Sequence, residues 1–219
     1  MKDKIKKFFA REEEIKEPTR EKDAKDKINL LQKENETLKA GINQIALEKF
    51  KTRRSIRKFS PENIKWKTIY EIVEGALNAP CAGNIQNYQV IVVEDKKKKH
   101  ELGKIAFQQY WLADAPTILV IVRDNYHLCQ LYPDQGEVYA IQNSAAFIEN
   151  ILMLAHFYDL GACWVEAYDN DVLKELLEIP PNMTVDAIIP IGYPLESPQI
   201  SKEPMLQKMF FENYGNKKR

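Results

Sequence analysis

The stretch Thr52-Arg53-Arg54-Ser55-Ile56-Arg57-Lys58-Phe59 combines three arginines, a lysine and a serine within eight residues. Two apolar residues interrupt the charge, so the run can be anchored to a core. In an extended segment, Arg53, Ser55 and Arg57 lie on the same side. Guanidinium groups bind phosphate oxygens through paired, charge-assisted hydrogen bonds, and a serine hydroxyl adds a further donor. We therefore predict an anion site for the phosphate of a cofactor; the alternative is a solvated basic patch.

Length and composition limit the class of protein. The 219 residues suffice for one full domain with an appendage, and a hydrophobic share of 44% fits a globular core. The formal net charge is zero, which gives no support to nucleic-acid binding through bulk positive charge. The cysteines Cys81, Cys129 and Cys163 are odd in number and widely spaced. This spacing indicates free thiols in a reducing compartment.

Targeting signals are absent from the sequence pattern. No apolar run approaches the roughly 20 residues that span a bilayer, and the charged N-terminus lacks the apolar part of a secretory signal. We therefore expect a soluble, cytoplasmic protein. The basic start, Met1 to Phe9, is the one candidate for contact with anionic membranes. The acidic run Glu12-Glu13-Glu14 argues against it, so no membrane partner is predicted.

Residues 1–41 are predicted to form a charged helical extension, and residues 42–219 the main domain. From residue 28 on, apolar residues recur in alternating steps of three and four, the heptad pattern of a coiled coil. The members of this series are Ile28, Leu31, Asn35, Leu38, Ile42 and Ile45.

Polar residues in this heptad indicate pairing between chains. With Ile28 at position a, Asn35 also falls at a, where a single Asn sets the register of parallel two-stranded coiled coils. Glu34 at g can then pair with Lys39 at the following e of a second chain. The repeat covers under three heptads, however, and Gly41 lies inside it. Two interpretations stay open: a self-associating coiled coil, or a helix that packs on its own domain.

The rest of the chain alternates helical and strand-like patterns. Ser60 and Pro61 are typical of a helix start, and Gly161 of a helix end. The charge run Lys96 to Lys99 is predicted to be solvated, and residues 123–138 to be irregular. Expected helices cover residues 42–51, 60–78, 100–110, 139–158 and 170–177, and expected strands cover residues 88–93, 117–122, 163–166 and 187–192.

Several kinds of chemistry have no motif here. All eight glycines are isolated, so neither GxGxxG nor a P-loop occurs. The sequence contains no GxSxG elbow, and the histidines have no metal-ligand spacing. We predict no metal site and no catalytic side chain. That pattern is typical of a protein whose bound cofactor carries the chemistry.

Five segments together resemble the nitroreductase family of flavin mononucleotide (FMN) proteins, over about residues 42–206. The resemblance implies an α+β fold with a mostly antiparallel central sheet flanked by helices, assembled as a homodimer with FMN at the subunit interface. The segments are Arg53 to Phe59, Ala79 to Tyr88, Ala113 to Pro116, Gln142-Asn143 with the following helix into Leu160-Gly161-Ala162, and Ile189 to Pro194.

The resemblance also implies roles for residues. Arg53, Ser55 and Arg57 would hold the phosphate and ribityl chain, and Lys202 would close the site from the C-terminal side. The loop from Pro80 to Gln86, rich in small and amide residues, would contact the flavin ring from the partner subunit. Backbone around residues 165–167 would face the ring, with an N–H near flavin N5. The full predicted cofactor-binding set is Arg53, Arg54, Ser55, Arg57, Pro80, Cys81, Ala82, Gly83, Asn84, Gln86, Val165, Glu166, Ala167 and Lys202.

This sequence departs from the family pattern at three places. Cys81 stands where serine is common, Asn87-Tyr88 replaces Pro-Trp, and Lys202 replaces an arginine. Lysine lacks the planar fork of a guanidinium, so Lys202 is the weakest of these assignments. Cys81 is interpreted as a filler of serine size, with a redox-active thiol beside the flavin as the alternative.

The activity implied by the resemblance is hydride transfer from NADH or NADPH, through flavin N5, to nitroaromatics, quinones or similar small electron-poor acceptors. The order would be ping-pong. Substrate choice would rest in residues 104–113 and 123–138, where Tyr110, Trp111 and Tyr126 are candidates for a stacking lid. Alternatives are a specialised flavoenzyme of the same fold (a dehalogenase or an oxidase), or a non-catalytic flavin-binding scaffold acting through its coiled coil.

Overall fold

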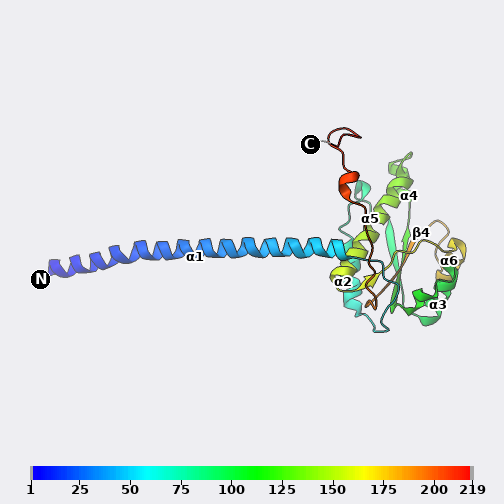
Figure 1. The fold of residues 1–219 in the computed structure, drawn as a ribbon, viewed down its shortest axis with the longest axis horizontal. Coiled ribbons are helices and arrows are strands. Elements are labelled where there is room, and N and C mark those ends of the chain that lie inside the picture. Colours follow the sequence, from blue (N-terminus) through cyan, green and yellow to red (C-terminus); the bar gives the residue numbers. More distant parts are fainter. Residues whose placement is uncertain (1, 218–219) are drawn as a thin grey trace. The chain divides into compact units, whose positions relative to one another are not determined.

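The structure is a computed structural model that describes the backbone of residues 2–217 and the side chains of residues 25–217. The chain forms two compact units, one ending at Thr52 and one beginning at Arg53. The first is a helix, α1 (Lys2–Thr52; Figure 1). The predicted domain boundary between residues 41 and 42 stays a prediction. The side chains of Met1 to Phe9, the candidate for membrane contact, lie outside the described residues.

The second unit is built on a four-stranded sheet with the order β1-β2-β4-β3. Every pair of neighbouring strands is antiparallel, which confirms the predicted α+β class with a mostly antiparallel sheet. The predicted strand at residues 163–166 is wrong in its bounds, because the strand there covers only two residues and is followed by an isolated bridge from Val165 to Ile188. The strands are β1 (Tyr88–Val93), β2 (Thr117–Arg123), β3 (Gly161–Ala162) and β4 (Thr184–Gly192).

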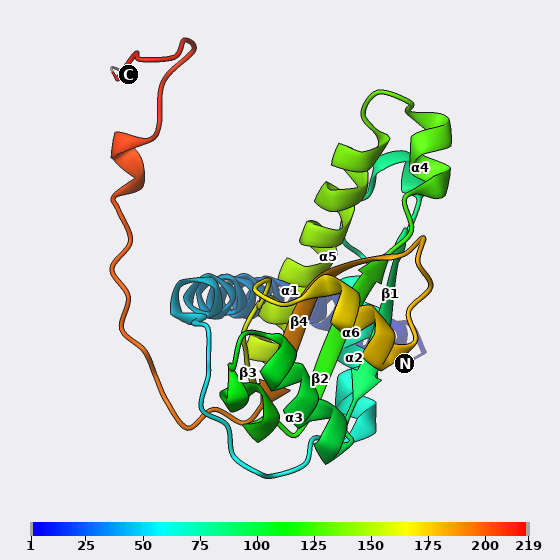
Figure 2. The ribbon, with the colours of Figure 1, turned by 90° about the vertical axis from the view of Figure 1, so that its right-hand side faces the viewer.

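Helices cover both faces of this sheet (Figure 2). Because successive side chains of a strand point to opposite faces, Leu119 and Ile121 of β2 pack in one core with α2 and α5. Ile118 and Val120 pack in a second core with α3 and α6. The helices are α2 (Trp66–Ala76), α3 (Lys96–Ile105), α4 (Tyr126–Leu131), α5 (Gly136–Phe157) and α6 (Asn170–Leu177), with short 3-10 turns η1 (Ala82–Asn84), η2 (Tyr110–Asp114) and η3 (Met205–Gln207).

The start predicted for one helix is wrong, and so is the residue predicted to close another. The helix expected from Ser60 begins at Trp66, because Ser60 N–H donates to Tyr193 O and holds this part of the chain extended. The end of α5 relies on Asp159, whose φ of 58° supplies the left-handed turn expected of Gly161. Gly161 instead allows a close approach, since a Cβ there would lie 2.7 Å from Ile56.

The interpretation of Lys96 to Lys99 as a solvated run is wrong for its last member. The run forms the start of α3, with Asp95 as the N-cap that accepts from Lys98 N–H at 2.8 Å. Lys99 is buried, and its Nζ donates to Ala115 O at 2.6 Å and to Pro116 O at 3.0 Å. The Lys99 amine therefore satisfies the two backbone carbonyls that directly precede β2. Likewise, the segment 123–138, expected to be irregular, contains α4.

Replacing Lys99 by methionine is expected to lower the free energy of unfolding by about 1–3 kcal/mol, because two buried carbonyls lose their donor. Burial lowers the pKa of Lys99 below its ordinary value of 10.5. The folded state thus releases this proton at lower pH than the unfolded state, so wild-type stability gains from Lys99 as pH rises towards 10.5. Urea unfolding at pH 7 and at several values between pH 8 and 10 should show the stability of the wild type rising relative to that of Lys99→Met. The difference between the wild type and Lys98→Met, an exposed neighbour, should stay constant.

Candidate functional site

The arginine run lies between two other segments of the second unit. Ile56 N–H donates to Ala162 O at 3.1 Å, which joins the run to the edge strand β3. Residues 58–60 pair with residues 193–195 through two backbone hydrogen bonds of 2.9 Å. The backbone is therefore held extended from both sides, and alternate side chains must project together.

Arg53, Ser55 and Arg57 of the run all lie near Cys163, directly after β3. Burial raises the pKa of the Cys163 thiol; the nearby Arg57 guanidinium, a hydrogen bond from Ser55 and the charge of Arg53 oppose that rise. The structure thus brings Arg53, Ser55 and Arg57 to one place, as the alternation of the extended segment predicts. Two cations and a hydroxyl in one place form a donor set suited to a phosphate.

Each arginine is also positioned by a neighbour in the second unit. Arg53 Nε lies 4.0 Å from Glu149 Oε1 of α5. The Arg57 guanidinium lies over the Trp111 ring, 5.7 Å from its centroid, a cation–π geometry. Arg54 Nη1 donates to Arg53 O at 2.8 Å, so Arg54 turns back on the main chain of the run.

Sequence reasoning missed Glu196. Its Oε1 accepts the N–H groups of Arg57 at 2.6 Å and of Lys58 at 3.2 Å. The two partners are more than 130 residues apart in the chain, so no local pattern could reveal the pair. This carboxylate fixes the run but also adds negative charge beside the anion site. Lys202, the predicted C-terminal ligand, is exposed in the irregular segment between β4 and η3.

The loop from Pro80 to Gln86 is held by one buried amide. Asn143 of α5 accepts Ala82 N–H at 2.8 Å and donates to Ile85 O at 3.2 Å, and it is 3% exposed. With the backbone shaped this way, Gly83 and Asn84 take left-handed conformations. Asn84 and Gln86 are exposed and bonded to each other at 3.2 Å, and Gln86 Nε2 lies 3.5 Å from Cys81 Sγ.

The loop and the arginine run attach to α5 at different points. The loop is bound by Asn143 and the run by Glu149, six residues further on, which is about 9 Å along a helix. Within one chain, the loop and the arginine run therefore form two separate groups of predicted cofactor-binding residues.

Of the predicted backbone positions near residue 165, one N–H is already used. Val165 N–H donates to Ile188 O at 3.0 Å, and Val165 O accepts from Ile188 N–H at 2.9 Å. Glu166 and Ala167 follow this bridge and are exposed. Ala167 O accepts from the Gln109 side chain at 3.4 Å.

The structure does not bring the three predicted lid aromatics together within the chain. Tyr110 and Trp111 precede β2, whereas Tyr126 follows it, and the seven-residue strand between them is about 20 Å long. Trp111 is half-buried against Ile56 and Phe59 and lies under Arg57. Its contacts assign it to positioning the arginine run, while Tyr110 and Tyr126 remain exposed.

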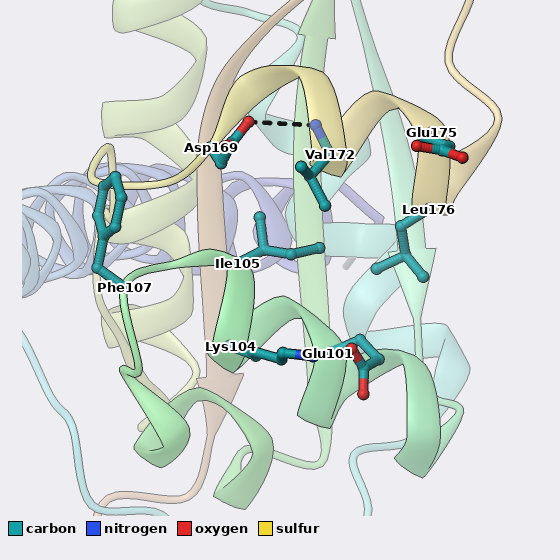
Figure 3. Close-up of a pocket in the computed structure, with 8 residues that line it drawn as sticks. All are labelled: Glu101, Lys104, Ile105, Phe107, Asp169, Val172, Glu175 and Leu176. Atoms are coloured by element: carbon teal, nitrogen blue, oxygen red, sulfur yellow. Dashed lines mark hydrogen bonds and ion pairs between the residues drawn. The ribbon is translucent and has the colours of Figure 1, made fainter.

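A groove of about 500 Å³ lies elsewhere, between α3 and α6 (Figure 3). Phe107 and Leu176 stand at its two ends, and the capping bond from Val172 N–H to Asp169 forms part of its wall. None of the residues predicted to bind the cofactor lines it. Its lining residues are Glu101, Lys104, Ile105, Phe107, Asp169, Val172, Glu175 and Leu176.

Comparison with known proteins identifies the class. The pattern of the nitroreductase family matches residues 50–111 and 105–193. A relative from Archaeoglobus fulgidus, provisionally named NADH dehydrogenase/NAD(P)H nitroreductase, is 33% identical over 147 residues, which cover 65% of this chain and 82% of the relative. The FMN reductase (NADPH) of Bacillus subtilis is 26% identical, covering 78% of this chain and 74% of that protein.

A solved structure agrees with these relatives. A nitroreductase family protein from Clostridium novyi NT superimposes with a TM-score of 0.63 at 27% identity, over 78% of this chain and 94% of that one. The chain belongs to the nitroreductase family, as its five sequence segments predict. No helix among the described residues is long and apolar enough to cross a membrane.

Proposed function

We propose that this protein takes hydride from NADH or NADPH and delivers it, by way of bound FMN, to small electron-poor acceptors such as nitroaromatics and quinones. The chain is an NAD(P)H-dependent oxidoreductase of the nitroreductase family, and FMN is its cofactor. The observation that carries the proposal is that Arg53, Ser55 and Arg57 lie near one another on an extended backbone. This backbone is hydrogen-bonded to β3 and to residues 193–195.

The donor set of this chain fits FMN. Two guanidiniums and a hydroxyl suit a phosphate dianion, and Glu149 and Trp111 lie beside the two guanidiniums. FMN, when bound, supplies the ring atom N5 that accepts and returns the hydride. With Val165 N–H bonded to Ile188, we assign the donor near N5 to the N–H of Glu166 or Ala167. A fixed donor of this kind stabilises charge that develops during the reaction.

A homodimer completes the site in this proposal. Asn143 holds the amide-bearing loop of one chain at a point on α5 separate from the arginine run. We assign the loop to the FMN bound by the partner chain, so that each cofactor is touched by both copies. Pro80, Cys81, Ala82, Gly83, Asn84 and Gln86 would form that contact. Lys202 would join the phosphate site once the C-terminal segment closes over it.

The reaction order that we propose is ping-pong: the oxidised nicotinamide leaves before the acceptor enters the same place. Orientation and positive charge are the contributions of the protein, because no catalytic side chain is assigned. Because β2 separates Tyr110 from Tyr126 within one chain, we propose that the two residues face the acceptor from different copies of the dimer. The proposed location is the cytoplasm.

A visible absorption spectrum of the purified protein, followed by anaerobic addition of NADH or NADPH, tests this function. We expect a bound-flavin spectrum that bleaches with one or both nucleotides and returns when a quinone or nitroaromatic is added. Nucleotide without protein, and the same acceptor without nucleotide, serve as controls. A colourless protein that takes up no added FMN would overturn the proposal and leave the run as a surface patch.

A further inference from the structure

Helix α1 carries a stripe of exposed apolar side chains along one side. Ile28, Leu31, Leu38, Ile42 and Ile45 are between 54% and 66% exposed. These residues are spaced three and four apart, which places them along one seam of the helix. Large aliphatic side chains exposed in this number indicate a surface that a partner covers.

The kinds of residue in the stripe identify the partner. Ile28, Asn35 and Ile42 occupy position a, Leu31 and Leu38 occupy position d, and Ile45 occupies d in the last layer. Isoleucine at a with leucine at d favours two parallel strands, because each shape fits the packing geometry of its own layer in a dimer. The helical structure of residues 28–45, without a break at Gly41, places all of these positions in one continuous heptad frame.

Polar residues select parallel, in-register pairing. Asn35 lies at the centre of the stripe, and a buried Asn finds a partner only opposite an Asn of a second chain at the same level. Glu34 at g and Lys39 at the following e have opposite charges, so each chain can offer both members of the pair to the other. The seam thus matches a second copy of itself in charge as well as in shape.

We infer that residues 28–45 form a parallel two-stranded coiled coil with a second copy of this chain. At a rise of 1.5 Å per residue, the paired segment is about 27 Å long. A coil this short is marginal by itself. It gains stability where another contact already holds the two chains together, because the second contact is then intramolecular.

Cysteine cross-linking of the full chain tests the coiled coil. In a parallel dimer the two copies of position d lie at the same level, within the Cα separation of 4.4–6.8 Å that a disulfide requires. We expect Leu31→Cys and Leu38→Cys each to form a covalent dimer under mild oxidation. Lys33→Cys, at the outward position f, is the matched control on the same helix and should not. The wild type, with its three free cysteines, sets the background.

The outcomes separate this inference from the proposed function. Cross-linking at both d positions supports parallel pairing even for protein that contains no FMN. Cross-linking at one d position alone, at neither, or equally at Lys33→Cys overturns it, because an antiparallel or unpaired helix cannot bring both pairs of equivalent cysteines together. Loss of dimer mass in dilute solution for the double variant Leu31→Lys/Leu38→Lys, compared with the wild type, would support the contribution of the coil to assembly. An unchanged mass at every concentration would overturn that contribution.

Discussion

Arg53→Ala is expected to yield protein that has lost most of its FMN after gel filtration. Arg53 approaches the site from the start of the run and is oriented by Glu149 at 4.0 Å. A hydrogen bond to a charged group is worth roughly 1.5–3 kcal/mol, so the affinity for FMN should fall by about 10- to 150-fold. The flavin-to-protein absorbance ratio and a fluorescence titration of the apoprotein with FMN measure this directly.

Lys58→Ala is the matched control for this experiment. It removes the same charge from the same run, but Lys58 is exposed and lies on the opposite side of the extended segment from Arg57. Its backbone contact with Glu196 does not need the lysine side chain. Equal loss of FMN in both variants would mean that bulk charge attracts the cofactor, and equal retention would remove Arg53 from the site.

Asp186→Ala is expected to have the largest effect on stability, about 3–5 kcal/mol, because it leaves the buried charge of Arg123 uncompensated. Asp186 Oδ1 accepts from Arg123 Nε at 2.7 Å, and the two side chains are 13% and 6% exposed. Arg123 also donates to Asn125. Urea unfolding at pH 7 should show a lower midpoint with little change in slope.

Exposed Asp134 offers a control for the loss of a carboxylate, and Asp134→Ala should change stability by less than about 0.5 kcal/mol. Asp186→Ala together with Arg123→Met should recover part of the lost stability, because an apolar pair no longer leaves a buried charge alone. A midpoint for Asp186→Ala equal to that of Asp134→Ala would contradict the assigned role.

The position of Asp186 depends on an irregularity of the sheet. Ile121 pairs with Ala187 and Val122 with Val185, so Asp186 is the extra residue of a bulge in β4. A bulge changes the direction of a side chain relative to strict alternation, and here it accompanies the approach of Asp186 to Arg123. Alternation along β4 could not indicate this pairing, because the extra residue shifts the alternation.

Local sequence determined much of the fold and the outline of the site. The apolar runs at 117–122 and 187–192 form strands that are buried on both faces of the covered sheet, and the run at 88–93 forms the partly buried strand β1. The spacing of Arg53, Ser55 and Arg57 predicted their common side, since extended backbone alternates at every residue. The heptad of residues 28–45 likewise predicted a helix with one apolar seam.

Tertiary structure alone decided which polar residues became buried and what each one holds. By sequence, Lys99 belongs to a charge run that predicts solvation. In the fold it is buried and donates to the carbonyls of Ala115 and Pro116. Asn143 and Glu196 act on segments 61 and 139 residues away in the chain. Such contacts form because buried polar groups must find partners wherever the fold places them. Periodicity reports which side of an element faces the core; the partner across the core is set only when distant segments pack together.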